Sequence, residues 1–94
     1  MADVQPPLDH LHPAPGRFRM SANLEAEMRG VGLDPRSLAL YSRLPIDLVR
    51  AVLESRVASK RVLVQIRRGL IVAARYADRS ADHITLAYLA EEAE

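Results

Sequence analysis

The sequence predicts an all-α fold, a small bundle of four to five helices preceded by a disordered, proline-rich arm. Apolar residues recur at helical spacing in several segments, and no segment alternates polar and apolar residues over a useful length. The 94 residues suffice for one domain with a modest core. Apolar residues make up 49% of the chain, with one Phe and no Trp, so the predicted core is aliphatic.

Residues 1–19 are predicted to form the disordered arm. Four of the six prolines lie there, and proline lacks a backbone donor and resists helix formation. The arm also carries His10 and His12. Two ligands do not complete a coordination shell, so no metal site is predicted from this pair.

The folded domain is predicted to span residues 20–76. Its first helix begins at Ser21 or Asn23, because Ser21 is a good N-cap and apolar residues follow at helical spacing. Gly30 and Gly32 end this helix.

Two prolines mark the starts of the second and third helices. Asp34 caps the second helix, and Pro35 fits its first position, where no backbone donor is needed. This helix runs to about Ser42. The third helix covers about Pro45 to Ser55.

A long fourth helix follows a short link at residues 56–58. Ser59 caps it, and the helix runs from Lys60 to about Tyr76 with an apolar stripe on one face. Gly69 lies inside this helix at a cost of about 1 kcal/mol relative to Ala. The glycine therefore indicates a close contact with another helix.

Residues 77–94 are predicted to contain an acidic C-terminal helix over about residues 81–92. Such a helix, with a narrow apolar stripe, does not bury itself alone. It either packs on the fourth helix or pairs with a second copy in a homodimer. We predict a homodimer formed through Ile71, Tyr76, Ile84, Tyr88 and Leu89, with packing on the same chain as the alternative.

The net charge of +1 conceals a segregation of charge along the chain. Residues 29–79 carry eleven basic and four acidic side chains, a net charge of +7, whereas residues 1–28 sum to −2 and residues 80–94 to −4. All but one of the central bases are Arg, whose planar fork suits phosphate groups and guanine edges. This pattern indicates a polyanionic partner. The alternative is that Arg only solvates helix surfaces in a protein encoded by a GC-rich genome.

Other classes of protein are not expected. The chain has no Cys, and no apolar run approaches the roughly 18–20 residues of a membrane helix. The first residues lack the pattern of a signal peptide, so a cytoplasmic location is predicted. His83 is isolated, and neither a carboxylate pair nor a glycine-rich phosphate loop stands out, so no enzymatic activity, metal or cofactor is predicted.

Residues 34–56, DPRSLALYSRLPIDLVRAVLESR, resemble the helix-turn-helix of bacterial DNA-binding proteins of the Cro/repressor and lactose-repressor types. A small residue lies where the two helices would touch, and apolar residues follow five, ten and thirteen positions later. These residues are Ala39, Leu44, Val49 and Val52. The next segment also matches, with a polar loop, a Ser cap and apolar residues at spacing four: Ser59, Val62, Ile66 and Leu70. The resemblance covers about residues 24–70.

Two positions depart from that pattern. Gly usually occupies the turn, where φ is positive, but this chain has Arg43, which implies strain or a different turn. Ser or Thr usually caps the recognition helix, but here Leu44, which has no capping oxygen, precedes Pro45.

The resemblance implies a transcriptional regulator whose helix at about residues 45–55 enters the major groove of double-stranded DNA. The implied base-reading residues are Ile46, Asp47, Arg50 and Glu54. The implied phosphate-binding residues are Arg36, Arg43, Arg56, Lys60 and Arg61. Against this, Asp47 and Glu54 repel phosphates, and Arg50 has an alternative role as a surface residue paired with either of them.

A second class of function stays open at this point. A small helical protein-binding module, such as an antitoxin, an anti-sigma-like factor or an inhibitor, would grip a protein partner with its helices and N-terminal arm. The acidic residues of the third helix, the missing turn glycine and the arm favour this class.

Overall fold

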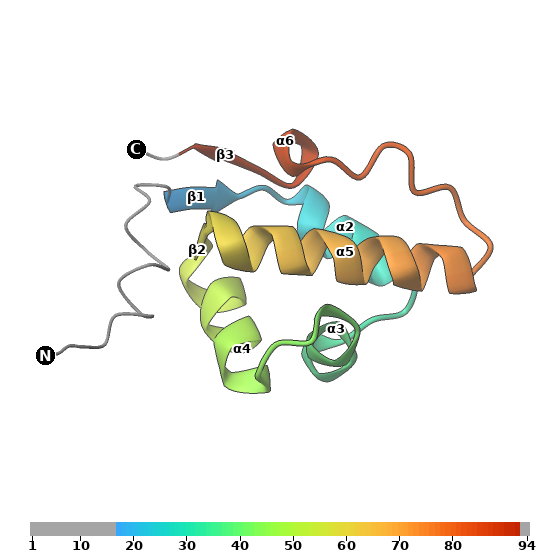
Figure 1. Cartoon of the computed structure of the whole chain (residues 1–94), viewed down its shortest axis with the longest axis horizontal. Coiled ribbons are helices and arrows are strands. Elements are labelled where there is room, and N and C mark those ends of the chain that lie inside the picture. The colour runs from blue at the N-terminus through green and yellow to red at the C-terminus, as the bar shows by residue number, and fades with distance from the viewer. Residues whose placement is uncertain (1–16, 93–94) are drawn as a thin grey trace, which may run out of the picture.

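The computed structural model describes residues 17–92 and combines helices with a small sheet (Figure 1). The all-α prediction is therefore wrong, and the fold is mixed α/β. In chain order the elements are β1 (Arg17–Met20), α2 (Asn23–Gly30), α3 (Pro35–Ser42), α4 (Ile46–Ser55), β2 (Val57–Ser59), α5 (Lys60–Tyr76), α6 (Leu86–Leu89) and β3 (Ala90–Glu92).

The sheet is antiparallel and has the strand order β2-β1-β3. Phe18 of the central strand pairs with Ala58 of β2 and with Glu92 of β3. The sheet thus joins the two ends of the described chain to the link between α4 and α5, as Figure 1 shows at its left side. Strands of three or four residues are too short to display a period-two alternation, which explains why the sequence predicted none.

The predicted ends of the chain also need correction. Residues 17–19, assigned to the disordered arm, lie in β1, whereas the prolines and histidines of the arm lie outside the described residues. The helix predicted over residues 81–92 is reduced to the four residues of α6. Residues 90–92 are good helix formers, but they pair with β1, so tertiary pairing overrides their local preference.

The predicted starts of α3 and α5 are confirmed. The Asp34 carboxylate accepts from the Ser37 backbone N–H at 2.8 Å, and Ser37 Oγ accepts from the Asp34 N–H at 2.9 Å, which completes a capping box. Ser59 Oγ accepts from the Val62 N–H at 3.3 Å at the start of α5. For α2 the predicted cap is wrong: the helix begins at Asn23, one of the two predicted starts, but its N-cap residue is Ala22, without a side-chain cap. Ser21 Oγ accepts from the Asn23 N–H at 3.1 Å.

The close helix contact predicted at Gly69 is present. Gly69 of α5 lies against Ser42 of α3, and a Cβ on Gly69 would stand 2.3 Å from Ser42 Oγ and 2.8 Å from its backbone nitrogen. Only glycine lets the two helices approach this closely. The contact fixes α3 on α5, and α4 follows α3 directly.

The core is aliphatic, as predicted, and every helix contributes to it. Among its fully buried side chains are Leu24 of α2, Leu38 of α3, Val49 of α4, Leu63, Ile66 and Leu70 of α5, Ile84, and Leu89 of α6. Burying a Val, Leu or Ile side chain stabilises a fold by about 1.5–3 kcal/mol. Because Ile84 and Leu89 lie in this core, the C-terminal segment belongs to the same folded unit.

Candidate nucleic-acid interface

The corner formed by α3 and α4 has the packing that the sequence predicted. Ala39 is buried where the two helices meet, and Val49 and Val52 point from α4 into the core. Leu44, in the turn, is half-buried against the same core. One face of α4 is therefore held inward, which leaves the opposite face to solvent.

Arg43 closes α3 in the left-handed conformation, with φ of 59° and ψ of 45°. Of the two alternatives for this turn, positive φ at a non-glycine residue is the one observed. Such a conformation costs a side-chain-bearing residue roughly 1–2 kcal/mol. The turn is held by two backbone hydrogen bonds, from the Arg43 N–H to Leu40 at 3.2 Å and from the Leu44 N–H to Ala39 at 3.0 Å.

The start of α4 has no side-chain cap. The predicted position of Pro45 is corrected by one residue: α4 begins at Ile46, and Pro45, not Leu44, is its N-cap residue, in an extended conformation. The Pro45 carbonyl accepts from the N–H groups of Leu48 and Val49 at 3.1 and 3.2 Å. The earlier N–H groups of the helix therefore remain available to an outside acceptor such as a phosphate oxygen. Asp47 in this first turn complements the helix dipole but also opposes an anion.

The outward face of α4 carries three of the four predicted base-reading residues. Asp47, Arg50 and Glu54 are exposed, whereas Ile46 is half-buried and packs against the core. The ion pairs within residues 17–92 are Arg19–Glu91 and Arg56–Glu25, and the His83–Glu27 contact is a hydrogen bond that becomes an ion pair only when His83 is protonated. Arg50 thus makes none with Asp47 or Glu54 in the described chain, and its guanidinium faces solvent.

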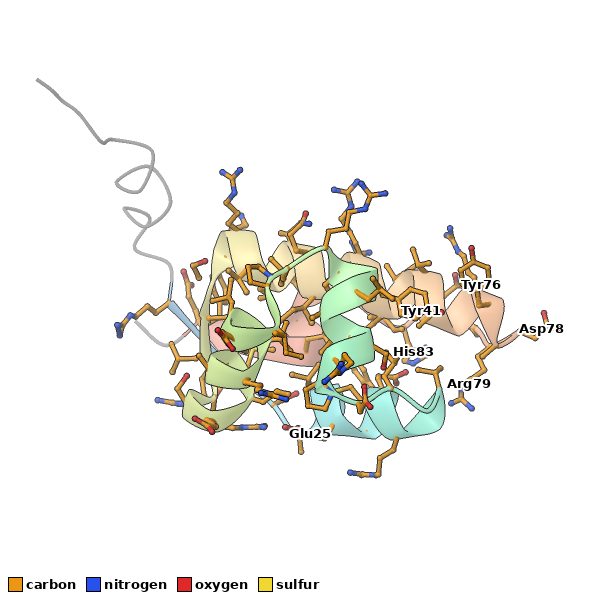
Figure 2. All side chains as sticks on the ribbon, turned by 90° about the horizontal axis from the view of Figure 1, so that it is seen from below. Glu25, Tyr41, Tyr76, Asp78, Arg79 and His83 are labelled. Carbon is orange, nitrogen blue, oxygen red and sulfur yellow. The ribbon has the colours of Figure 1, made fainter. Side chains whose placement is uncertain are left out.

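Four of the five predicted phosphate-binding residues are exposed. Arg36 lies at the start of α3, Arg43 in the turn, and Lys60 and Arg61 at the start of α5. Figure 2 views the molecule from the side on which α3 and α4 lie and shows side chains projecting from both helices.

Arg56 differs from the other four because its guanidinium is engaged within the chain. It forms an ion pair with Glu25 of α2 and donates to the Met20 carbonyl at 3.2 Å. Its backbone ends α4 at φ of 64°, and its N–H donates to the Val52 carbonyl at 2.8 Å. Sequence reasoning missed this contact because Glu25 lies 31 positions away. Contact with phosphate here would compete with Glu25.

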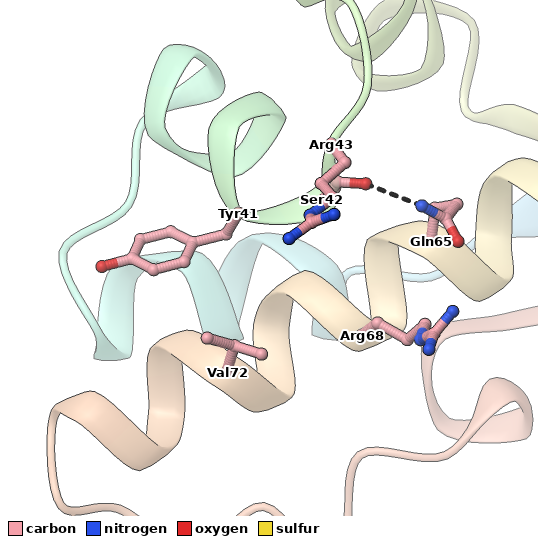
Figure 3. Close-up of a pocket in the computed structure, with 6 residues that line it drawn as sticks. All are labelled: Tyr41, Ser42, Arg43, Gln65, Arg68 and Val72. Atoms are coloured by element: carbon pink, nitrogen blue, oxygen red, sulfur yellow. Dashed lines mark hydrogen bonds between the residues drawn. The ribbon is translucent and has the colours of Figure 1, made fainter.

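A hollow of about 330 Å³ lies beside the turn, between the end of α3 and the middle of α5 (Figure 3). Gln65 Nε2 donates to the Ser42 carbonyl at 3.0 Å and ties the two helices together there. Ser42 Oγ is buried and has no hydrogen-bond partner in the described structure. Arg68, for which the sequence predicted no role, also lines this hollow.

The predicted dimerisation residues do not form one surface. Ile84 and Leu89 are buried in the core of the chain itself, and Tyr88 hydrogen-bonds within it. Ile71 is half-buried, and Tyr76 is 78% exposed. The alternative given for the C-terminal segment, packing on its own chain, is what the structure shows.

A polar cluster anchors the C-terminal segment to α2. Glu27 is 8% exposed, and its Oε2 accepts from the Tyr88 hydroxyl at 2.8 Å and lies 2.8 Å from His83 Nε2. Burial raises the pKa of Glu27, but the hydrogen bonds from Tyr88 and His83 and the charges of His83 and Arg79 outweigh it, so the net pKa is lowered. The bond to Glu27 raises the pKa of Tyr88.

The same segment is held at further points by its backbone. Ser21 Oγ and Asn23 Nδ2 donate to the Tyr88 carbonyl at 3.0 and 2.8 Å, and the Ser21 N–H donates to the Leu89 carbonyl at 2.8 Å. Arg67 Nε donates to the Ile84 carbonyl at 2.8 Å. These bonds fix the segment on the side of the fold away from α3 and α4 (Figure 1).

Comparison with protein-family models, curated proteins and solved structures finds no significant match to the chain. Within residues 17–92, no group of three His, Cys, Asp or Glu side chains is arranged to hold a metal ion. None of the helices in the described part of the chain has the length and apolar character that crossing a bilayer requires.

Proposed function

We propose that the protein binds double-stranded DNA sequence-specifically as a transcriptional regulator, with α3 and α4 acting as a helix-turn-helix. One observation carries the proposal. The apolar face of α4 is buried through Val49 and Val52 while Arg50 lies exposed and without an ion-pair partner in the described chain. An amphipathic helix held in this way is suited to the major groove, which is wide enough for one helix.

Under this proposal, the side chains of α4 recognise different bases. Arg50 would donate both arms of its guanidinium to the O6 and N7 acceptors of guanine. Asp47 and Glu54 would accept from the amino group of cytosine, and the half-buried Ile46 would contact a thymine methyl group. If α4 were displaced along the groove, the carboxylates of Asp47 and Glu54 would face phosphate groups and be repelled. These two residues would therefore disfavour binding in any other position.

The exposed cations around α4 would hold the DNA backbone. Arg36, Arg43, Lys60 and Arg61 come from three different segments, so together they would define the orientation of the duplex. Arg56 supports this surface indirectly, because its pairing with Glu25 fixes the end of α4.

Selection of binding sites from a pool of duplexes with a randomised centre tests the proposal. We expect an enriched motif, and we expect Arg50→Ala to lose about 1–3 kcal/mol of affinity for it and to relax the preference at one base pair. Arg29→Ala, an exposed arginine at the end of α2, is the matched control. A pool that shows no enrichment would contradict sequence-specific recognition.

The same selection tests the predicted homodimer. A dimer that binds DNA symmetrically would enrich a palindrome whose half-sites lie about one helical turn apart. A single, asymmetric motif would instead indicate that one chain binds alone.

A further inference from the structure

Large apolar side chains are exposed on α3 and on the second half of α5. Leu40 is 76% exposed, Tyr76 78% and Val72 39%. Tyr41 is half-buried beside them, with its ring centroid 6.1 Å from that of Tyr76. These four side chains are termed the α3–α5 patch. Figure 2 shows its two tyrosines side by side, beyond α3 as seen from α4.

The hollows around the patch adjoin one another, because neighbouring hollows share lining residues. Ser37 lines both the hollow at Leu40 and the next one, of about 280 Å³, which Tyr41 and Tyr76 also line. Tyr76 and Val72 line a third hollow. Val72 also lines the hollow of about 330 Å³ beside the turn. A surface of alternating apolar ridges and hollows between two helices is the kind that receives a third helix.

The rim of the patch is strongly basic. The residues that line these four hollows include four arginines, which are Arg36, Arg43, Arg68 and Arg75. The one acidic residue among them is Asp34, whose Oδ1 accepts from the Ser37 hydroxyl and backbone N–H. All four arginines are exposed, and none takes part in the ion pairs of the described chain.

The basic rim determines which kind of partner the patch can bind. A second copy docked through the same patch would bring four guanidinium groups from each chain together, and like charges across an interface oppose association. A duplex would satisfy the arginines but would leave the exposed Leu40 and Val72 against a polar backbone. A protein surface that carries both apolar and acidic side chains satisfies both features.

We propose that the α3–α5 patch binds an acidic amphipathic helix of a partner protein. Apolar side chains at positions i, i+3, i+4 and i+7 of that helix would cover Leu40, Val72 and Tyr76. Its carboxylates would pair with the arginine rim, where Arg gives bidentate contacts. This inference goes beyond DNA binding. It shares Arg36 and Arg43 with the surface proposed for DNA, and its test requires no DNA.

The test uses the full-length chain without DNA and two synthetic amphipathic peptides with the same apolar face, one with Glu and the other with Lys at its polar positions. Titration is followed by the backbone amide signals of the isotopically labelled protein. We expect the Glu peptide to shift the signals of Leu40, Tyr41, Val72 and Tyr76 saturably. It should bind about tenfold more tightly than the Lys peptide.

Variants separate apolar contact from charge. Leu40→Ser and Tyr76→Ser should each weaken binding of the Glu peptide by about fivefold or more, as expected for central contacts. Both side chains are exposed, so the fold should persist, which circular dichroism checks. Ala87→Ser, an exposed alanine of α6 outside the patch, is the matched control. Replacing Arg68 and Arg75 together by Glu should reverse the preference to the Lys peptide.

Several results would overturn the proposal. The proposal fails if neither peptide binds, if both peptides bind equally, or if the shifted signals belong only to other surfaces. Shifts of the patch signals when the protein alone is concentrated would assign the patch to a second copy. Shifts of these signals by duplex DNA, larger than those of α4, would assign it to nucleic acid. Failure of DNA binding alone would leave the peptide result standing.

Discussion

Ser42 of α3 and Gly69 of α5 meet so closely that no side chain fits between them. A Cβ on Gly69 would stand 2.8 Å from the Ser42 backbone nitrogen and 3.0 Å from its Cα, so the obstruction is backbone and not a flexible side chain. Gln65, one helical turn before Gly69 on α5, donates a side-chain hydrogen bond to the Ser42 carbonyl. This joint therefore sets the position of α3, and through the next turn that of α4.

Gly69→Ala is expected to destabilise the protein. Alanine favours a helix interior over glycine by about 1 kcal/mol, but inserting a methyl group against the α3 backbone costs typically 1–3 kcal/mol and shifts the helix. We expect the free energy of unfolding in urea to fall by roughly 1–2 kcal/mol, and DNA affinity to fall with the displaced α4.

Gly30→Ala provides the control for that measurement. A Cβ at Gly30 would meet only the guanidinium of Arg79, at 3.0 Å, and the far end of an exposed arginine moves aside easily. This variant should keep the stability of the parent within about 0.5 kcal/mol, as surface substitutions usually do. Equal stability of both alanine variants would contradict the role assigned to the joint.

Arg43 offers a test that separates backbone strain from charge. Arg43→Gly should stabilise the chain by up to about 1 kcal/mol, because glycine accepts positive φ at no steric cost but loses more conformational freedom on folding. Arg43→Ala keeps the strain and should bring no such gain. Both variants should weaken DNA binding alike, as loss of one phosphate contact. A gain in stability with alanine equal to that with glycine would show that the turn is not strained.

Local signals explain what the sequence could predict. Asp34 with Pro35 marked the start of α3, and Ser59 that of α5, because a cap bonds a backbone group only three residues away. The contact at Gly69 could also be predicted. A glycine inside a long helix lowers helix stability, and a close approach of another helix compensates for that loss. The partner, Ser42, was not predictable, because nothing local links the two positions.

The features that were missed all join distant segments. The pairing of Phe18 with Glu92 involves strands too short to show a pattern. The pairs Arg56–Glu25 and His83–Glu27 use residue types that are ordinary on helix surfaces, so the sequence placed Arg56 on DNA and left His83 isolated. The α3–α5 patch was missed because residues on separate helices form it.

Glu27 should make the stability of the protein depend on acid pH. Its folded-state pKa lies below the ordinary value of 4.5, so its charge contributes stability above that pH, and the contribution is lost as pH falls through the folded-state pKa. Glu27→Gln should lower the free energy of unfolding at pH 7 by about 1–3 kcal/mol, because hydrogen bonds to a charged acceptor are lost. The difference from the parent should shrink below pH 4.5 in urea unfolding measured at a series of pH values.

Glu54→Gln is the matched control for Glu27, since Glu54 is exposed and makes none of these contacts. It should leave the unfolding free energy at pH 7 within about 0.5 kcal/mol of the parent. A difference between Glu27→Gln and the parent that stays constant from pH 7 to acid pH would contradict an ionised, bonded Glu27.

The exposed cations around α4 predict how DNA binding responds to salt. The four phosphate contacts proposed for each chain, from Arg36, Arg43, Lys60 and Arg61, would give a slope of about −3.6 for the logarithm of affinity against the logarithm of salt concentration. Lys60→Ala should reduce that slope by about 1 and weaken binding to all duplexes alike. Arg56→Gln should act differently, because this guanidinium is paired with Glu25: it should lower the free energy of unfolding and leave the slope unchanged. Fluorescence anisotropy over a salt series measures the slope, and an equal change in slope for both variants would show that Arg56 leaves Glu25 for phosphate.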